Sequence, residues 1–451
     1  MGQTTILIDI GSTFTKAVAV DVAGAAVVAT ARAPTTAGSD VRIGLRQALA
    51  ALEPRVGRIE QADTLASSSA AGGLRMISIG LVPELSAEAA RRAALGAGAK
   101  IVGHFSHELS HAETASIAAL RPDIVLLAGG TDGGNSRTIL HNARRLATAT
   151  VRAPLVVAGN KSAQDEALAI LASAGWDCHV VDNVMPRIGV LQVEACRAAI
   201  REIFIANIVH AKGLDGARSL VSEIVMPTPV AVLEAARLLA EGDGGTPGMG
   251  ELLVVDVGGA TTDVYSVARG LPSDPSVTLH GLPEPWAKRT VEGDLGVRHN
   301  VETLLDLCAR FGVDADRSHA AKLLAMPQRL PGDDAEARFD GQLAAVAVRE
   351  SVDRHVGRIE TLHGPQGESR LQVGKDLSSL GTVIGTGGPI IHGRDPRSIL
   401  RGACADRSGL PKPADPALYL DADYLMFALG LLARREPRVA STLLRAHLRP
   451  I

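Results

Sequence analysis

The chain has 451 residues, 46% hydrophobic and 21% charged, a composition that predicts a soluble protein of two or three globular domains. Its net charge of -3 and the lack of a basic stripe with aromatic residues argue against a nucleic-acid partner. The longest late apolar run, Leu425 to Ala433, is too short to span a bilayer, and the first residues lack a basic leader. We therefore expect a cytoplasmic protein with no membrane partner.

The chain begins with a strand-turn-strand pattern from Ile6 to Val20, in which a β-branched apolar run ends at an aspartate. Glycine lets backbone N–H groups approach a ligand, and successive N–H groups at a turn bind anions. An aspartate beside such a turn can hold a hydrated Mg²⁺ that also contacts substrate phosphates. The pattern therefore predicts a site for a nucleoside triphosphate on a metal, formed by Asp9, Gly11, Ser12, Thr13 and Lys16.

Strands and helices alternate from Asp40 to Val181, which predicts a largely parallel sheet covered by helices. Asn160 and Lys161 follow one of these strands and could face either a nucleotide or a partner. Three histidines in this region lie at a strand end, in a loop and at a helix start, so we expect surface histidines rather than a metal site: His104, His107 and His111.

Residues 242–250 read GDGGTPGMG and are the best linker candidate in the chain. They directly precede a second copy of the first motif. We therefore expect an α/β fold of two lobes, residues 1–243 and 244–451, each a mixed sheet with flanking helices.

The second copy runs from Leu253 to Val267 and aligns with the first without a gap. Asp256 falls under Asp9, and Gly258 falls under Gly11. A single aspartate before glycine is more often a plain turn, but two copies with hydroxyls at matching offsets favour a phosphate site. The candidates added by this copy are Asp256, Gly258, Gly259, Thr261, Thr262 and Asp263.

A second pair of segments also suggests duplication. The segments 124–130 and 382–388 are each an apolar strand that ends in two glycines, and each follows its aspartate hairpin in the same order. We expect the two strands to be equivalent. The later segment adds Gly385, Gly387 and Gly388 as nucleotide-binding candidates.

The C-terminal part predicts further helices, among them Leu343 to Leu362 followed by a turn from His363 to Ser369. The helix from Ala422 to Arg434 contains small residues that allow another helix to cross it closely. We expect its partner to be the helix from Val193 to Ala211; the alternative is an ordinary core helix.

Several roles remain open on the residues alone. Asp9 and Asp256 could cap turns, but their paired placement favours catalysis through a metal-bound water. Lys16 could be solvated or could reach the phosphates as a point charge. Asp263 could be a cross-strand partner or a catalytic group near the metal. The threonines could bind phosphate or cap the hairpins.

Together these motifs resemble the actin-like ATPase superfamily, which includes actin, sugar kinases and heat-shock chaperones. The segment from Asp9 to Lys16 resembles its first phosphate motif, and the segment from Asp256 to Asp263 resembles its second. The run from Gly385 to Pro389 resembles its adenosine motif. The resemblance implies two lobes with a nucleotide cleft between them, and ATP with Mg²⁺ as the bound ligands.

Three further segments resemble the MutL-type accessory proteins of glutamate mutase, which are unrelated to the mismatch-repair proteins of similar name. They are residues 70–74, 128–135 and 289–296. The last contains Glu292 and Asp294, for which the match favours a role beside the nucleotide over an exposed acidic turn. This resemblance implies a factor that reactivates or assembles an adenosylcobalamin-dependent mutase, with the mutase subunits as partners and a homodimer as one expected state.

Three alternative functions share parts of this pattern. A small-molecule kinase of the same superfamily would need a carboxylate base and an acceptor pocket, and no motif for these is evident. A nucleotide-binding scaffold protein stays open. Activators of 2-hydroxyacyl-CoA dehydratases share the opening motif but hold an iron–sulfur cluster through nearby cysteines. The four cysteines here are far apart, so we expect reduced thiols: Cys178, Cys196, Cys308 and Cys404.

Overall fold

The computed structural model describes residues 4–11, 13–36, 40–69, 74–211, 220–282, 284–326, 330–364 and 367–451. The chain divides into two compact units. Unit 1 comprises residues 1–70, 216–280 and 284–451, and unit 2 comprises residues 71–215 and 281–283. Both aspartate hairpins belong to unit 1. The proposed lobe boundary at residue 243 stays a prediction.

The first sheet of unit 1 has the strand order β10-β4-β1-β2-β3. Its central strand β1 runs antiparallel to β2 and parallel to β4. Helix α1 covers β2 and β3 and begins after Asp40, whose carboxylate accepts the Arg42 N–H as a helix cap. The bounds are β1 Thr4–Ile10, β2 Phe14–Asp21, β3 Ala26–Pro34, β4 Thr64–Ser68, β10 Glu223–Pro227 and α1 Val41–Val56.

The second sheet of unit 1 has the order β14-β12-β11-β17-β18-β19. Its central strand β11 runs antiparallel to β12 and parallel to β17. The long helix α10 packs against β11 and β12. The bounds are β11 Leu252–Val257, β12 Thr262–Val267, β14 Ala287–Glu292, β17 Thr382–Thr386, β18 Ala417–Asp421, β19 Leu448–Pro450 and α10 Asp334–His355.

The two sheets share one topology. In each, two successive antiparallel pairings follow on one side of the central strand and two successive parallel pairings on the other; the second sheet adds antiparallel β19 at its edge. The predicted duplication and the predicted class, α/β with mixed sheets flanked by helices, are therefore confirmed. The predicted second pair is wrong, because the equivalent of β17 is β4. The segment at residues 124–130 forms β7 in another sheet, since any buried parallel strand that ends in glycines gives the same signal.

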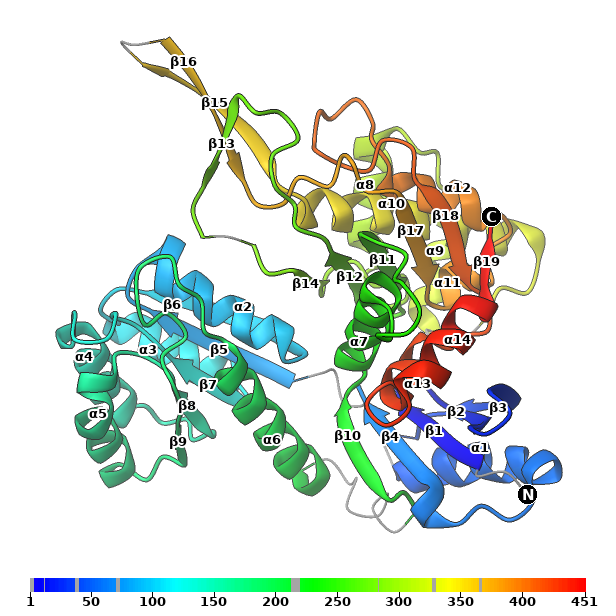
Figure 1. The fold of residues 1–451 in the computed structure, drawn as a ribbon, viewed down its shortest axis with the longest axis horizontal. Helices are drawn as coiled ribbons and strands as arrows, with labels where there is room; N and C mark the ends of the chain where they lie inside the picture. The colour runs from blue at the N-terminus through cyan, green and yellow to red at the C-terminus, as the bar shows by residue number, and fades with distance from the viewer. Residues whose placement is uncertain are drawn as a thin grey trace. The chain divides into compact units, whose positions relative to one another are not determined.

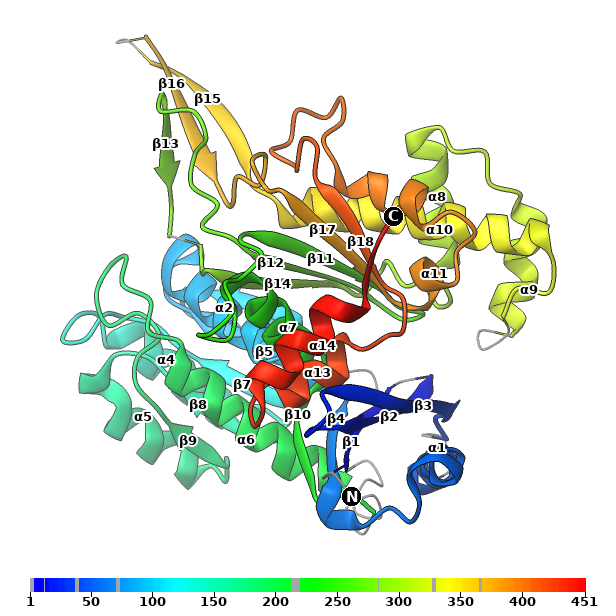
Figure 2. The same cartoon turned by 45° about the vertical axis from the view of Figure 1, so that its right-hand side comes forward.

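A helix follows the last parallel strand of each half: α7, Thr228–Glu241, after β10, and α13, Met426–Leu432, after β18. They pack against each other between the two sheets (Figures 1 and 2). A Cβ added to Gly430 would lie 1.8 Å from the Ala231 carbonyl oxygen, so the close crossing requires glycine. The partner expected for α13 was Val193 to Ala211, which is wrong. That segment is α6, Glu194–Ala211, in unit 2.

Side chains of both sheets and both helices share one aliphatic core. It includes Leu7 and Val18 from the first sheet, Val254 from the second, and Ala231 and Leu429 from the helices. With only 2% aromatic residues in the chain, close packing there depends on small and branched side chains. The core thus places the two central strands, and the hairpins that they begin, on either side of α7 and α13.

The remaining elements of unit 1 include a three-stranded sheet, β13-β16-β15, which lies away from the two larger sheets (Figure 1). The expected helix from Leu343 to Leu362 is wrong at its end. Helix α10 ends at His355, and Gly357 packs against Val373 so that the chain pairs as a hairpin. The bounds are β13 Val277–His280, β15 Arg358–Gly364, β16 Gly367–Val373, α8 Val301–Phe311, α9 Ala320–Ala325, α11 Gly388–Ile391, α12 Pro396–Leu400 and α14 Pro437–His447.

Unit 2 contains a parallel sheet of order β6-β5-β7-β8-β9 flanked by helices, as the alternating pattern predicts. Asn160 is buried and bonds to Gly133 and Gly134, so it tethers the loop after β7, while Lys161 is exposed. The bounds are β5 Leu74–Gly80, β6 Ala99–Ser106, β7 Ile124–Leu127, β8 Leu155–Val157, β9 Cys178–Val180, α2 Glu88–Gly96, α3 His111–Ala119, α4 Arg137–Ala147 and α5 Lys161–Ser173.

Candidate functional site

The two hairpins of unit 1 turn in the same way. The Gly11 N–H donates to the Phe14 carbonyl at 3.2 Å, and the Gly258 N–H donates to the Thr261 carbonyl at 2.9 Å. A Cβ on Gly11 would lie 2.6 Å from the Phe14 oxygen, and a Cβ on Gly258 would lie 2.9 Å from the Thr261 oxygen. Both turns therefore require glycine for close packing. Ser12 lies outside the described residues.

The turns of the two hairpins approach each other. A Cβ added to Gly259 would lie 4.0 Å from Thr13 Oγ1. Residues far apart in the sequence, one from each half of unit 1, therefore meet at the turns. An anionic ligand could contact both turns at once in this arrangement.

Asp9 is buried, with 2% of its surface exposed. Its carboxylate accepts a hydrogen bond from Thr228 Oγ1 at 2.6 Å, and Lys16 Nζ lies 3.4 Å away. Lys16 faces Asp9 across the hairpin ladder. Lys16 is therefore ion-paired rather than freely solvated, and it lies beside the turn where a phosphate would bind.

Asp256 stands at the same place on the second hairpin and is half-buried. Burial raises its pKa from 3.8 to about 7, helped by the nearby carboxylates of Asp263, Asp421 and Asp9 and opposed by Lys16. The site thus carries more negative charge than its one lysine neutralises. A divalent cation would relieve that excess.

Asp263 is directly opposite Asp256 in the β11–β12 ladder. Its carboxylate pairs with the buried guanidinium of Arg289 on β14 at 2.6 Å and accepts from Thr261 Oγ1 at 3.2 Å. The Thr262 hydroxyl donates to the Leu295 carbonyl at 2.7 Å. These contacts hold the second hairpin in place. Asp263 pairs across strands, which was one of its two expected roles, whereas the roles of the threonines stay predictions. The catalytic role of Asp263 stays a prediction.

The loop at residues 292–299 packs directly on the second hairpin. The Arg298 and His299 N–H groups donate to the Gly259 carbonyl at 2.9 and 3.1 Å. Earlier in the loop, Glu292 and Asp294 each lie 2.8 Å from the Arg354 guanidinium on α10. Burial raises the pKa of Glu292 even though Arg354 opposes the change. Both acids are therefore held in ion pairs beside the hairpin turn.

The glycines after β17 differ in what surrounds them. Gly385 packs against Leu400, 2.7 Å from the position of its missing Cβ. Gly387 has φ of 93°, and its Cβ would lie 2.2 Å from the Val257 oxygen and 2.7 Å from Asp256 Oδ1. Gly388 borders open space. Packing alone thus requires glycine at 387, and a Cβ at 385 would displace the Leu400 side chain, whereas Gly388 leaves room for a ligand.

Sequence reasoning missed three residues at this site. Thr228, at the start of α7, bonds to Asp9. Asp421, at the end of β18, accepts from Thr386 Oγ1 at 2.8 Å. The Tyr424 ring lies over Lys16 Nζ at 3.5 Å from its centroid. Thr228 and Asp421 follow equivalent strands, so a correct alignment of the two halves would have indicated them.

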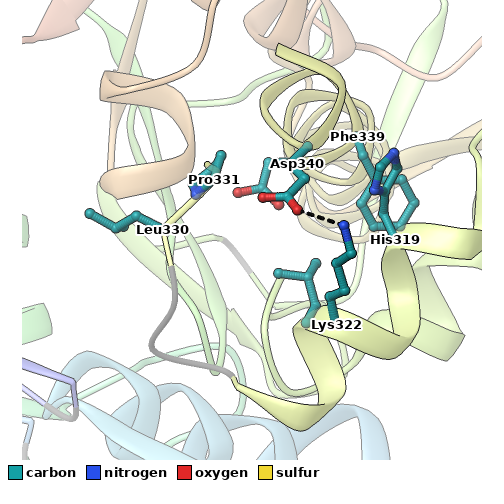
Figure 3. A pocket seen from close by; sticks show the side chains of 8 residues that line it. His319, Lys322, Leu330, Pro331, Phe339 and Asp340 are labelled. Atoms are coloured by element: carbon teal, nitrogen blue, oxygen red, sulfur yellow. Dashed lines mark hydrogen bonds and ion pairs between the residues drawn. The ribbon is translucent and has the colours of Figure 1, made fainter. Parts of the chain in front are cut away.

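A pocket lies between α9 and α10, lined among others by Lys322, Phe339 and Asp340 (Figure 3). Asp340 on its wall forms a bidentate ion pair with Arg298, whose side chain packs against Gly259. Lys322 pairs with Glu336 across the pocket at 3.1 Å. Because these charged groups are paired with one another, they present no free charge to a ligand in the pocket.

The oxygen-rich donor set suits Mg²⁺. No group of three or more histidine, cysteine, aspartate or glutamate side chains is placed to hold a metal within the described ranges. Mg²⁺ commonly binds through one or two carboxylates, several waters and substrate phosphates, and Asp9 and Asp256 fit that pattern. His104, His107 and His111 are exposed, as expected, and the four cysteines are free. None of the described helices is long and apolar enough to cross a membrane.

Two solved structures show distant likeness to the chain. A nucleotide-free acetone carboxylase is 15% identical, with 96% of this chain and 70% of that chain covered and a TM-score of 0.44. Xylulose kinase from Bifidobacterium adolescentis is 12% identical, with 100% and 94% covered and a TM-score of 0.33. At these scores neither carries an argument about activity.

The sequence comparisons are much closer. The family model described as MutL protein matches residues 5–448. Protein MutL from Clostridium tetanomorphum is 45% identical over 458 residues, which cover 98% of each chain. The resemblance read from the motifs is confirmed: the chain belongs to the MutL protein family.

Proposed function

We propose that unit 1 binds Mg·ATP at the two hairpin turns and hydrolyses it slowly. The observation that carries the proposal is the meeting of two equivalent turns, each beside an aspartate, at Thr13 and Gly259. Two turns with donor N–H groups and a cluster of acids suit a polyphosphate bound through a divalent cation. Magnesium would supply charge neutralisation and would orient the phosphates and a water.

The residues of the chain then take distinct roles. The turns at Gly11 and Gly258 would contact the phosphates, with Thr13 and Gly259 beside them. Lys16 supplies a positive charge. Asp9 and Asp256 hold the hydrated metal, and Thr228 orients Asp9 through its 2.6 Å hydrogen bond. The open space at Gly388 suits the adenosine.

Helices α7 and α13 provide a route from nucleotide to conformational change. Thr228, at the start of α7, touches Asp9, and the loop that precedes α13 touches Lys16 through Tyr424. The helices cross tightly at Gly430. A change of ligand at the hairpins would therefore bias how the two halves pack, which is the requirement for an ATP-driven switch.

The client that we propose is an adenosylcobalamin-dependent mutase of the glutamate mutase type, in the cytoplasm. This step rests on membership of the MutL family and on the motif resemblance. A factor of this kind would favour a mutase conformation that releases a damaged corrinoid. It can shift the mutase only as far as its own differential affinity for the two conformations allows. A homodimer stays a prediction.

The test is reactivation of an inactivated glutamate mutase by the full-length protein with Mg·ATP and fresh adenosylcobalamin. We expect recovery of activity that requires ATP and that fails with Asp9→Ala. Asp314→Ala, which changes an exposed aspartate of unit 1, is the matched control and should behave as wild type. Equal recovery with wild type and Asp9→Ala, or no recovery with either, would contradict the proposal.

A further inference from the structure

The Lys16 ammonium is held on two sides. Its Nζ lies 3.4 Å from Asp9 Oδ2 and 3.5 Å from the centroid of the Tyr424 ring. The Phe427 ring centroid is 5.9 Å away. A cation over the face of an aromatic ring is attracted by the negative charge of that face. The lysine therefore has two partners from different halves of unit 1.

The backbone before α13 holds the Tyr424 ring in this position. Tyr424 has φ of 57°, in the left-handed region that bulky residues seldom adopt. Asp421 fixes the loop, because its carboxylate accepts the Leu425 N–H at 2.7 Å and the Met426 N–H at 3.2 Å. The Tyr424 N–H donates to the Asp421 carbonyl at 3.1 Å. The strained conformation is thus held by several hydrogen bonds.

We propose that Tyr424 is a positioning residue for the ATP site: its ring holds the Lys16 ammonium at the first hairpin. The inference rests on the proposed function. If Asp9 held a hydrated metal, its ion pair with Lys16 would weaken, whereas the contact with the uncharged Tyr424 ring would persist. Tyr424 then keeps Lys16 beside the phosphates.

The same contact links the hairpin to α13. Tyr424 lies two residues before that helix, and α13 crosses α7 at Gly430. The Tyr424 ring limits the positions from which the Lys16 ammonium can contact a phosphate. The position of the loop before α13 therefore sets how well the first hairpin binds the nucleotide, and nucleotide binding in turn favours one position of that loop.

The experiment compares Tyr424→Phe, which keeps the ring, with Tyr424→Asn, which removes it and suits a left-handed backbone. Titration calorimetry with Mg·ATP on the full-length protein gives the affinity, and thermal denaturation confirms folding. We expect Tyr424→Phe to bind within about twofold of wild type and Tyr424→Asn roughly tenfold more weakly, the size of one partly desolvated cation–π contact.

The double variant separates positioning from a general effect on structure. In a Lys16→Gln background, Tyr424→Asn should change the affinity little, because the cation is gone. If wild type binds Mg·ATP but Phe and Asn variants bind equally, or if the Asn effect persists without Lys16, the role of Tyr424 is refuted while the proposed function stands. If folded wild type does not bind Mg·ATP, both fail.

Discussion

Replacing Asp256 by asparagine should stabilise the ligand-free protein, and more so as the pH rises. The pKa of Asp256 is raised from 3.8 to about 7, mainly by burial and by the carboxylate of Asp263. Between pH 5 and pH 7 the folded protein keeps a proton on Asp256 that the unfolded chain has lost. Stability therefore falls as the pH rises through this window, because the unfolded state binds fewer protons.

The size of this change in stability follows from the pKa shift of Asp256. Each pH unit in the window changes the free energy of unfolding by up to about 1.4 kcal/mol, so two units give at most about 2.8 kcal/mol. Because the Asp256 side chain is half-buried, solvent screening reduces this to about 1 kcal/mol. Asparagine cannot ionise, so the variant escapes this loss.

The assay is denaturant unfolding of nucleotide-free, magnesium-free protein at pH 5 and pH 7. The stability of Asp256→Asn relative to wild type should increase between these values by about 1 kcal/mol. Asp314→Asn, at an exposed position of the same unit, serves as the control and should show no such increase. An equal difference at both pH values would refute the claim that excess negative charge at the hairpins destabilises the empty site.

Three further changes test the packing around the site by thermal or denaturant unfolding. Gly387→Ala should cost about 2 kcal/mol or more, since its Cβ would lie 2.2 Å from a carbonyl oxygen, whereas Gly388→Ala, beside open space, should be nearly neutral. Arg354→Met should cost about 1 to 2 kcal/mol at pH 7, because it leaves three paired carboxylates without their cation, and less at pH 4, where Glu292, whose pKa burial raises, takes up a proton. Thr228→Val should cost about 1 kcal/mol through the lost hydrogen bond to Asp9. Equal effects for the two glycines, an Arg354 effect independent of pH, or a neutral Thr228→Val would each contradict the corresponding contact.

Local patterns predicted the hairpins well. The spacing of Asp9 and Gly11, repeated at Asp256 and Gly258, depends on contacts within four residues, and the structure shows the same turn in both copies. The α/β class and the parallel sheet of unit 2 also follow from local periodicity. Roles in binding or catalysis are not tested by these contacts, and they stay predictions.

Contacts between distant segments could not be predicted in this way. The strand equivalent to β17 is β4, whose end lacks the double glycine that suggested β7. Tyr424 meets Lys16 only because α13 packs between the two sheets. Helix α10 ends at His355 because Gly357 packs against Val373, a residue of the strand that pairs with β15. Each of these depends on a partner far away in the sequence.

Calorimetric titration of Mg·ATP into folded, nucleotide-free protein at pH 8, where Asp256 is ionised, tests the central claim most directly. We predict binding by wild type and by Asp314→Ala, and a loss of at least tenfold in affinity for both Asp9→Ala and Asp256→Ala, the cost of removing one charged ligand of the metal. No binding by folded wild type, or undiminished binding by both hairpin variants, would contradict the account.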